Sequence, residues 1–429
     1  MLDINLVRER SELVKKNEKK RSRDTHTVDL VLECDTQWRM MLKKVEDLKH
    51  QRNVVSQEIN KAKKTKKEKE AQQKIKEMQK VVEEIKKGEE EVQKLLENRD
   101  RLLLKLGNMM HSQVPFGKDA SENVEIKVWG KKPKFSFPVK HHVELVETLS
   151  IADFDASGKT SGHGFYFLKG ELGLLNQALL RFAINFMQKK KYIYIEPPLM
   201  IHKEVLSAAV DVTEFEKTIY GIEGEDLVLI GTSEHALLGL HAQENFTEKA
   251  LPRKYYSYSM CFRKEVGAHG INEKGLWRTH QFNKVEQFIF CAPEESEKYF
   301  QELLHNSEEI LKALKLPYRV LEICSGDLTL WKHRSYDLEV WRPTLNQYGE
   351  VMSLSNCTDY QARKLNIKLE RQGKREVVHT LNNTALATSR IMVAILENFQ
   401  TLKGTVKVPK VLWPYMGGVK ELGRKNKKQ

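Results

Sequence analysis

The stretch from Cys261 to Phe290 reads CFRKEVGAHGINEKGLWRTHQFNKVEQFIF, two strand-like runs around a glycine-containing loop. This pattern predicts an antiparallel β-hairpin. Because side chains alternate between the faces of a strand, charged and aromatic residues in each run should share a face: Arg263 with Glu265, and Phe282 with Lys284 and Glu286. Such a face offers partners for a phosphate, a base and amino groups. It equally suits cross-strand ion pairs exposed to solvent, so the hairpin alone leaves both alternatives open.

The composition limits the class of protein. The chain has 429 residues, which suits two or three domains, and a net charge of +13, which favours a polyanionic partner such as nucleic acid or an anionic membrane surface. No run of about 18 apolar residues occurs, so no membrane span is predicted. The five cysteines are scattered without a CxxC pair, which predicts reduced thiols and a cytoplasmic location, and neither a disulfide framework nor a zinc ribbon.

Residues 35–106 carry apolar side chains at three- and four-residue spacing on both sides of a polar interruption. This period lets two helices bury one seam against each other, so we expect a long antiparallel coiled-coil hairpin. Its tip, KAKKTKKEKE, is rich in lysine and is either a solvated end or a surface that follows phosphates. The candidates for nucleic-acid contact are Lys61, Lys63, Lys64, Lys66 and Lys67.

The remainder of the chain has a different pattern. Gly, Pro and Asn cluster in residues 111–140, which predicts a linker. In residues 141–429 helical and strand-like segments are mixed, without the regular spacing of βαβ units. We therefore expect an α+β fold, with a first domain over residues 1–110 and a second domain, an antiparallel sheet flanked by helices, over residues 141–429.

Polar residues follow an apolar strand at GTSE, where Thr232, Ser233 and Glu234 open a predicted helix. They form either an N-cap with an acidic first turn or the floor of a polar pocket. The chain has no Walker loop and no GxGxxG segment, so a bound nucleotide would be held in another way.

Two further segments place polar groups among apolar residues. In YGEVMSLSNC, Ser353 and Ser355 share a face, whereas strict alternation puts Glu350 on the other face unless the strand is irregular there. A carboxylate in this segment is either part of an ordinary half-buried strand or a Mg²⁺ ligand. In HTLNNTALATSRIMVAILENFQ, Arg390 lies in an apolar helix and needs an anion, either a core carboxylate or a phosphate.

These segments together resemble the class II aminoacyl-tRNA synthetases, and among them the seryl-tRNA synthetase family, over nearly the whole chain. KHQRNVVSQEINKAKK resembles the first helix of that family's arm. GFYFLKGELGLLNQAL and YIYIEPPLM resemble its motif 1, where Pro198 would lie at a dimer interface. GTSE resembles the serine-binding TxE signature, FRKEVGAHGINEKGLWRTHQFNKVE resembles motif 2, and HTLNNTALATSRIMVAILENFQ resembles motif 3, all in the family's order.

The resemblance implies a role for each of these residues. Three would act on the phosphates and the metal ion as catalytic residues: Arg263, Arg390 and Glu350. The serine site would comprise Thr232, Ser233, Glu234, Arg263, Glu286, Asn382 and Thr384. The ATP site would comprise Arg263, Lys264, Glu265, Thr279, His280, Gln281, Phe282, Glu350, Val351, Met352, Ser353 and Arg390, with Glu350 and Ser353 also holding Mg²⁺.

By the same resemblance the chain would join serine to tRNA-Ser, and to tRNA-Sec where that tRNA exists, as a homodimer that uses ATP and Mg²⁺ and no zinc. The loop from Val266 to Thr279 would move when the tRNA acceptor end arrives. Two departures stand out: the family usually has small residues at Trp331 to His333, and Thr384 stands where many members have serine. The alternatives are a synthetase-derived binding or regulatory homologue without charging activity and a related class II synthetase for threonine or another amino acid.

Overall fold

The computed structural model describes residues 1–210, 215–266 and 274–423. The chain divides into two compact units, Leu2–Gly107 and the residues from Asn108 onward. Among the described helices, none has both the length and the apolar character that crossing a bilayer requires.

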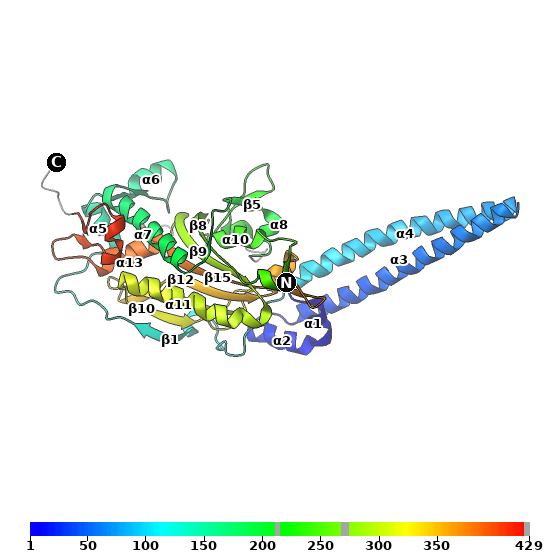
Figure 1. The fold of residues 1–429 in the computed structure, drawn as a ribbon, viewed down its shortest axis with the longest axis horizontal. Helices are drawn as coiled ribbons and strands as arrows, with labels where there is room; N and C mark the ends of the chain where they lie inside the picture. Colours follow the sequence, from blue (N-terminus) through cyan, green and yellow to red (C-terminus); the bar gives the residue numbers. More distant parts are fainter. Residues whose placement is uncertain (211–214, 267–273, 424–429) are drawn as a thin grey trace. The chain divides into compact units, whose positions relative to one another are not determined.

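The N-terminal unit consists of helices, and its two long ones form the predicted hairpin (Figure 1). They run side by side with a turn at residues 65–67. The first long helix begins at His26, earlier than the apolar pattern suggested. The helices are α1 (Ile4–Glu9), α2 (Ser11–Lys20), α3 (His26–Lys64) and α4 (Glu68–Leu103).

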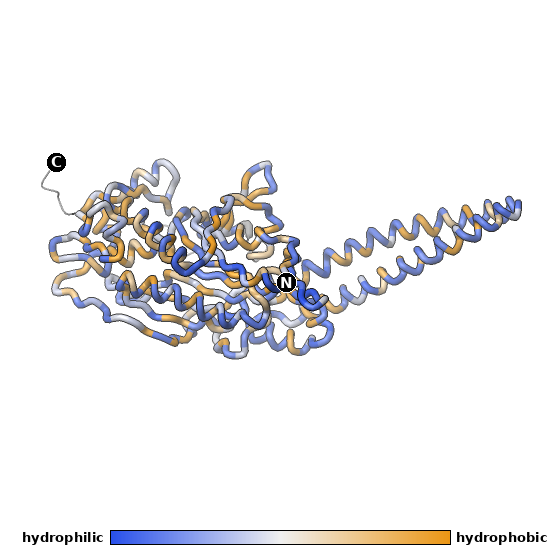
Figure 2. The backbone as a smooth tube through the Cα atoms, viewed as in Figure 1, coloured by the Kyte–Doolittle hydropathy of each residue, from blue (hydrophilic) through white to orange (hydrophobic). Residues whose placement is uncertain are grey.

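One seam of side chains joins α3 to α4. Figure 2 shows apolar positions recurring along both helices between hydrophilic ones. Ala62 and Ala71 are buried near the turn, and Ile85 is buried further along α4. Gly88 lies so close to Val45 that a Cβ added to it would approach a Val45 methyl carbon to 2.6 Å. Because only this seam is shielded from water, the hairpin has little core of its own.

A buried carboxylate organises the base of the hairpin. Asp35 binds Arg8 at 2.6 Å, Arg39 at 3.0 Å and Arg99 at 3.5 Å. Burial alone would raise the pKa of Asp35, but the arginines hold it below its ordinary value. The Arg99 guanidinium also lies 4.7 Å from the centre of the Trp38 ring, which explains why the apolar stripe of α4 accommodates an arginine.

The second unit is built on an eight-stranded sheet in the order β1-β10-β11-β12-β15-β9-β8-β4. Neighbouring strands are antiparallel except β4 and β8, which run parallel. The predicted α+β architecture is confirmed, with one parallel pair at an edge of the sheet. The strands are β1 (Val124–Trp129), β4 (Ile193–Ile195), β8 (Arg253–Phe262), β9 (Gln281–Cys291), β10 (Tyr318–Glu322), β11 (Arg334–Arg342), β12 (Gln347–Thr358) and β15 (His379–Ala387).

The segment predicted as a linker has a structural role, because it contributes the edge strand β1, which pairs with β10. The remaining strands are short and lie outside the large sheet. They are β2 (Ala152–Asp153), β3 (Phe167–Leu168), β5 (Met200–His202), β6 (Leu227–Leu229), β7 (Asn245–Thr247), β13 (Lys368–Arg371), β14 (Lys374–Val377), β16 (Val406–Lys407) and β17 (Glu421–Leu422).

Helices pack on the large sheet, and α11 marks one of its faces. Asn383 on β15 points to this helix, where its amide donates to the Leu303 carbonyl oxygen and to Ser307, both at 2.7 Å. Its neighbours Asn382 and Thr384 therefore face the opposite side of the sheet. The described helices of this unit are α5 (His142–Thr148), α6 (Phe154–Thr160), α7 (Gly170–Lys189), α8 (Lys203–Leu206), α9 (Phe215–Thr218), α10 (Ser233–Gly239), α11 (Ser296–Leu314), α12 (Tyr360–Lys364) and α13 (Thr388–Asn398).

Candidate active site

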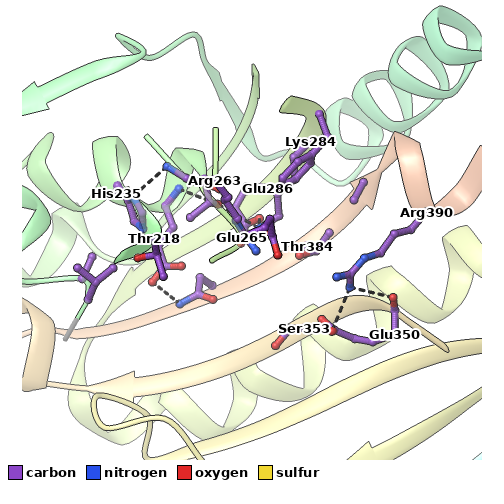
Figure 3. A pocket seen from close by; sticks show the side chains of 18 of the residues that line it. Thr218, His235, Arg263, Glu265, Lys284, Glu286, Glu350, Ser353, Thr384 and Arg390 are labelled. Atoms are coloured by element: carbon purple, nitrogen blue, oxygen red, sulfur yellow. Dashed lines mark hydrogen bonds and ion pairs between the residues drawn. The ribbon is translucent and has the colours of Figure 1, made fainter. Parts of the chain in front are cut away.

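A cavity of about 570 Å³ lies on the sheet face that carries Asn382 and Thr384. Its wall comes from strands β9, β12 and β15, from helices α10 and α13, and from the chain just after β8. Figure 3 shows side chains from these elements converging on this space. Residues that are far apart in the sequence are thus brought into one site.

Strand alternation builds the floor of the cavity. Phe282, Lys284 and Glu286 on β9 all line it, as the alternating pattern predicted. Glu286 is directly opposite Thr384 on β15, which also lines it together with Asn382. The polar face inferred for this strand is therefore turned toward a ligand-sized space and not toward open solvent.

Arg263 and Glu265 reach the cavity by a route that differs from the prediction. Strand β8 ends one residue before Arg263, so the two residues do not share a strand face. The Arg263 backbone N–H donates to the His280 carbonyl oxygen at 2.9 Å, and Glu265 has a φ of 51°, a left-handed conformation that redirects the chain. The Arg263 guanidinium lies 5.2 Å from the Phe282 ring centre, and its Nε donates to the Gly231 carbonyl oxygen at 3.1 Å.

An irregularity in β12 brings Glu350 into the cavity. Met352 is opposite Leu338, whereas Glu350 is opposite Glu339, so one residue of β12 has no partner on β11. Such a β-bulge changes the alternation of side chains along the strand. Glu350 therefore shares the cavity with Ser353, although strict alternation would separate them.

Arg390 and Glu350 bind each other in the cavity wall (Figure 3). The guanidinium donates to the Glu350 carbonyl oxygen at 2.9 Å and lies 3.0 Å from its carboxylate. Burial would raise the pKa of Glu350, but Arg390 holds it below its ordinary value. The side chains are 21% and 41% exposed, so a ligand in the cavity can reach both groups.

A buried cluster of charges lies beside α10. Thr232 caps this helix, and Lys284 donates to its hydroxyl at 3.0 Å while also pairing with Glu286. Glu234, in the first turn, accepts from the Asn382 amide at 3.0 Å. Burial raises the pKa of both carboxyls, that of Glu286 to about 7. Carboxylates that are costly to ionise without a partner suit the binding of a cationic group.

Five predicted residues do not line the cavity. The bulge leaves Met352 facing the apolar core, and the His280 ring lies against Phe165 with 5.1 Å between ring centres. The Lys264 ammonium lies 6.0 Å from the Tyr220 ring centre. The five are Ser233, Lys264, His280, Gln281 and Met352.

Several residues of the cavity wall were not predicted as ligands, among them Trp277, Arg278 and Lys284. Arg278 pairs with Glu265 at 2.6 Å, and Trp277 lies with its ring centre 5.7 Å from the Arg390 guanidinium. Both precede β9 and follow no periodic pattern that would have revealed them. Lys284, in contrast, alternates on β9 with Phe282 and Glu286, so the strand pattern was sufficient to place it on the same face as these two residues.

The bulky segment from Trp331 to His333 contributes to the cavity wall only in part. Trp331 and Lys332 line it. The His333 ring instead lies 2.5 Å from the Met109 carbonyl oxygen and does not reach the cavity. The predicted loop from Val266 to Thr279 includes residues 267–273, which lie outside the described residues.

A buried network holds Trp277 in place. The His142 ring accepts from the Leu276 N–H at 3.1 Å and lies 3.2 Å from Glu397. Glu397 in turn binds Arg342 at 2.7 Å, and the Arg342 guanidinium lies 4.2 Å from the Trp277 ring centre. Burial lowers the pKa of His142 to about 4, so the ring is neutral near pH 7.

The same network contains three side chains whose potential ligand atoms lie as close together as those of a metal site. Ligand atoms of His141, His142 and Glu397 lie within 4.8 Å of one another. Both nitrogens of His142 already have partners, and Glu397 binds a guanidinium. The group is therefore arranged as an anchor for the chain around Leu276.

Comparison with known sequences defines the class of protein. The model of the class II tRNA synthetase core domain (G, H, P, S and T) matches residues 215–399, and that of the seryl-tRNA synthetase N-terminal domain matches residues 1–110. The core match spans much of the sheet and most of the cavity wall. The fold and site are thus those of a class II aminoacyl-tRNA synthetase.

Individual relatives narrow the class to one family. The serine–tRNA ligase of Methanocella arvoryzae is 44% identical over 98% of this chain and 100% of its own length. The Pyrococcus horikoshii seryl-tRNA synthetase complexed with ATP has a TM-score of 0.91 at 42% identity, covering 98% of this chain and 99% of that one. The cytoplasmic serine–tRNA ligase of Naegleria fowleri in complex with AMP has a TM-score of 0.87 at 37% identity, covering 99% of each. This chain belongs to the seryl-tRNA synthetase family.

Proposed function

We propose that this chain is a serine–tRNA ligase, which activates serine with ATP and transfers it to the 3′ end of tRNA. The observation that carries the proposal is one cavity that is lined both by guanidinium groups and by the carboxylates of Glu234 and Glu286. Relatives with this activity match nearly the whole chain. A homologue without charging activity has less support, because Arg263, Glu286, Glu350 and Arg390 all line the same cavity.

ATP would occupy the part of the cavity near Arg263 and Phe282. The Phe282 ring offers a face for adenine, and the Glu265 carboxylate an acceptor for its amino group. Arg263 would neutralise the α-phosphate, and Arg390 the γ-phosphate. This assignment is supported by the four side chains, which all line the same cavity.

Serine would occupy the part of the cavity beside α10. The buried Glu286 and the half-buried Glu234 offer carboxylates suited to its ammonium group, and Thr232, Asn382 and Thr384 add polar groups around them. Serine differs from alanine by one hydroxyl. An acceptor that alanine leaves unpaired in such a buried site costs about 1–3 kcal/mol, which gives selectivity for serine.

Adenylate formation then needs no nucleophilic side chain. The serine carboxylate attacks the α-phosphorus, a new oxygen–phosphorus bond forms, and pyrophosphate leaves in line. Arg263 and Arg390 stabilise the negative charge that builds up on the phosphates. In the second step a ribose hydroxyl of the tRNA attacks the carbonyl carbon, and AMP leaves.

A divalent cation fits the oxygen donors near Arg390. Glu350 and Ser353 line the cavity, and Asp337 lies directly opposite Ser353 on β11. Carboxylate and hydroxyl oxygens are ligands that Mg²⁺ accepts. When bound with ATP, the ion would neutralise phosphate charge.

The proposal extends to the macromolecular partners. The exposed lysines at the turn between α3 and α4 would follow the backbone of tRNA-Ser, and of tRNA-Sec where it exists. A homodimer would let the hairpin of one protomer bind tRNA whose acceptor end enters the other active site. A cytoplasmic location is supported by five buried cysteines without a disulfide and by the description of the Naegleria relative.

Serine-dependent ATP–pyrophosphate exchange tests this proposal directly. We expect exchange with serine at least 100-fold faster than with alanine or threonine at equal concentration, followed by charging of tRNA-Ser. Exchange with threonine instead would identify the related synthetase. An absence of exchange with every amino acid, from protein that still binds ATP, would support the homologue without charging activity.

A further inference from the structure

Lys332 contributes an ammonium group to the lining of the cavity. It follows Trp331 in the segment between β10 and β11, and both residues line the cavity. The Lys332 Nζ lies 3.2 Å from the Ser335 hydroxyl and 3.4 Å from the Ser353 hydroxyl. Two contacts from adjacent strands fix the position of a side chain that is otherwise long and flexible.

An ammonium can only donate, so both serine hydroxyls accept from Lys332. The Ser335 hydroxyl donates its own proton to the Leu354 carbonyl oxygen at 2.8 Å. Lys332 is thus held as a donor above the floor formed by β11 and β12.

The register of the sheet shows which parts of the cavity Lys332 connects. Along β12 the polar residues that line it are, in order, Glu350, Ser353 and Ser355. Glu350 binds Arg390 in the phosphate part. Ser355 is opposite Asn382, whose amide binds Glu234 in the serine part. The Lys332 ammonium contacts Ser353 and also Ser335, which is opposite Ser355. It therefore lies between the phosphate part and the serine part of the cavity.

The charge of Lys332 acts on carboxylates in both the phosphate part and the serine part of the cavity. Burial raises the pKa of Glu234, and Lys332 is among the cations that oppose this rise. Burial would also raise the pKa of Glu350, and Lys332 acts with Arg390 against it. One ammonium therefore lies within electrostatic reach of carboxylates in both parts of the cavity.

Ser355 provides a second, independent sign of a ligand at this place. The residue is 1% exposed and lines the cavity, yet its hydroxyl has no hydrogen-bond partner within the described protein. A buried hydroxyl without a partner is costly, so a polar group of a ligand is expected to satisfy it.

We propose that Lys332 is a substrate-binding residue that bridges the carboxylate of serine and the α-phosphate of ATP. This inference rests on the proposed function. Both groups are anions, and they must approach each other before the oxygen–phosphorus bond forms. The ammonium lowers their repulsion and gives up no proton, since the carboxylate is the nucleophile and pyrophosphate the leaving group.

Lys332→Met tests the proposal, because methionine keeps an unbranched chain and removes the charge. We expect the affinity for a non-hydrolysable seryl-sulfamoyl adenosine, measured by calorimetry in EDTA, to fall about 10- to 100-fold. The affinity for adenosine should stay within twofold, which also shows that the variant is folded. Lys332→Arg, which keeps the charge, should lose less than Lys332→Met.

A charge-balancing role for Lys332 beside Asp337 is the competing explanation. If it were correct, the double variant Lys332→Met with Asp337→Asn would regain wild-type affinity for the analogue, and the proposal would be overturned. Unchanged affinity in Lys332→Met alone would overturn it as well. Neither result touches the proposed function, which fails only if the wild-type protein does not catalyse serine-dependent exchange.

Discussion

The turn of the α3–α4 hairpin and the floor of the cavity both carry many charges, but in opposite environments. The turn lysines are exposed, and water and salt screen each of them. The charges on the floor of the cavity are largely shielded, and they pair with one another, as Lys284 does with Glu286. Exposed charges contribute to binding through their total, so the removal of one of them changes the affinity little. Shielded charges act individually, because each leaves an unbalanced partner when it is removed.

The largest expected effect is that of one half-buried guanidinium. Arg263→Ala removes the group assigned to the α-phosphate, and we expect pyrophosphate exchange to fall about 1,000-fold. Arg375→Ala, which removes an exposed arginine of β14, should leave exchange within twofold. Exchange near the wild-type rate in Arg263→Ala, with an unchanged melting temperature, would remove the basis for the phosphate assignment.

Shortening the hairpin tests whether the two regions act independently. Val45 and Gly88 are in contact, so residues 46–87 can be replaced by a short turn without separating the helices. We expect tRNA-Ser charging to fall more than 100-fold while exchange stays within twofold, because the cavity is built from the second unit. A parallel loss of exchange would show that the regions are coupled.

The buried carboxyl of Glu286 predicts a pH dependence. Its pKa is raised to about 7, chiefly by burial, so the group is ionised above that pH and protonated below it. Since the ionised form binds the serine ammonium, kcat/KM for serine in exchange should fall about tenfold per pH unit below 7. The Glu286→Gln variant should have a lower kcat/KM for serine at every pH, and its pH profile should lack the inflection near pH 7. An inflection that persists in the variant would assign it to another group.

The smallest effect is expected at the turn lysines. Replacing Lys61, Lys63, Lys64, Lys66 and Lys67 by serine should lower kcat/KM for tRNA about tenfold at low salt, and less at high salt, because fewer counterions are released. The matched control replaces exposed lysines along α4: Lys76, Lys80, Lys86, Lys87 and Lys94. Equal losses in both variants would show that charge along the whole arm matters and not the turn.

Local sequence patterns were sufficient to predict the structure where a residue lies in a regular helix or strand. The apolar period of α3 and α4 predicted the hairpin, although the polar beginning at His26 was missed. Alternation on β9 predicted that Phe282, Lys284 and Glu286 share a face, and in the structure they do. These regularities follow from backbone geometry, which repeats every 3.6 residues in a helix and every two in a strand.

Other parts of the site depended on tertiary structure. The bulge that brings Glu350 and Ser353 into the same cavity arises from the pairing between β11 and β12. Strand β8 ends before Arg263 because the chain that follows makes other backbone contacts. Arg278 and Lys332 lie outside regular strands, where no period fixes the direction of a side chain. The sequence by itself therefore determined the helical hairpin, the α+β class and the residue types of the site. Only the packed sheet decided which charges meet in the cavity, because that depends on register and on partners distant in the chain.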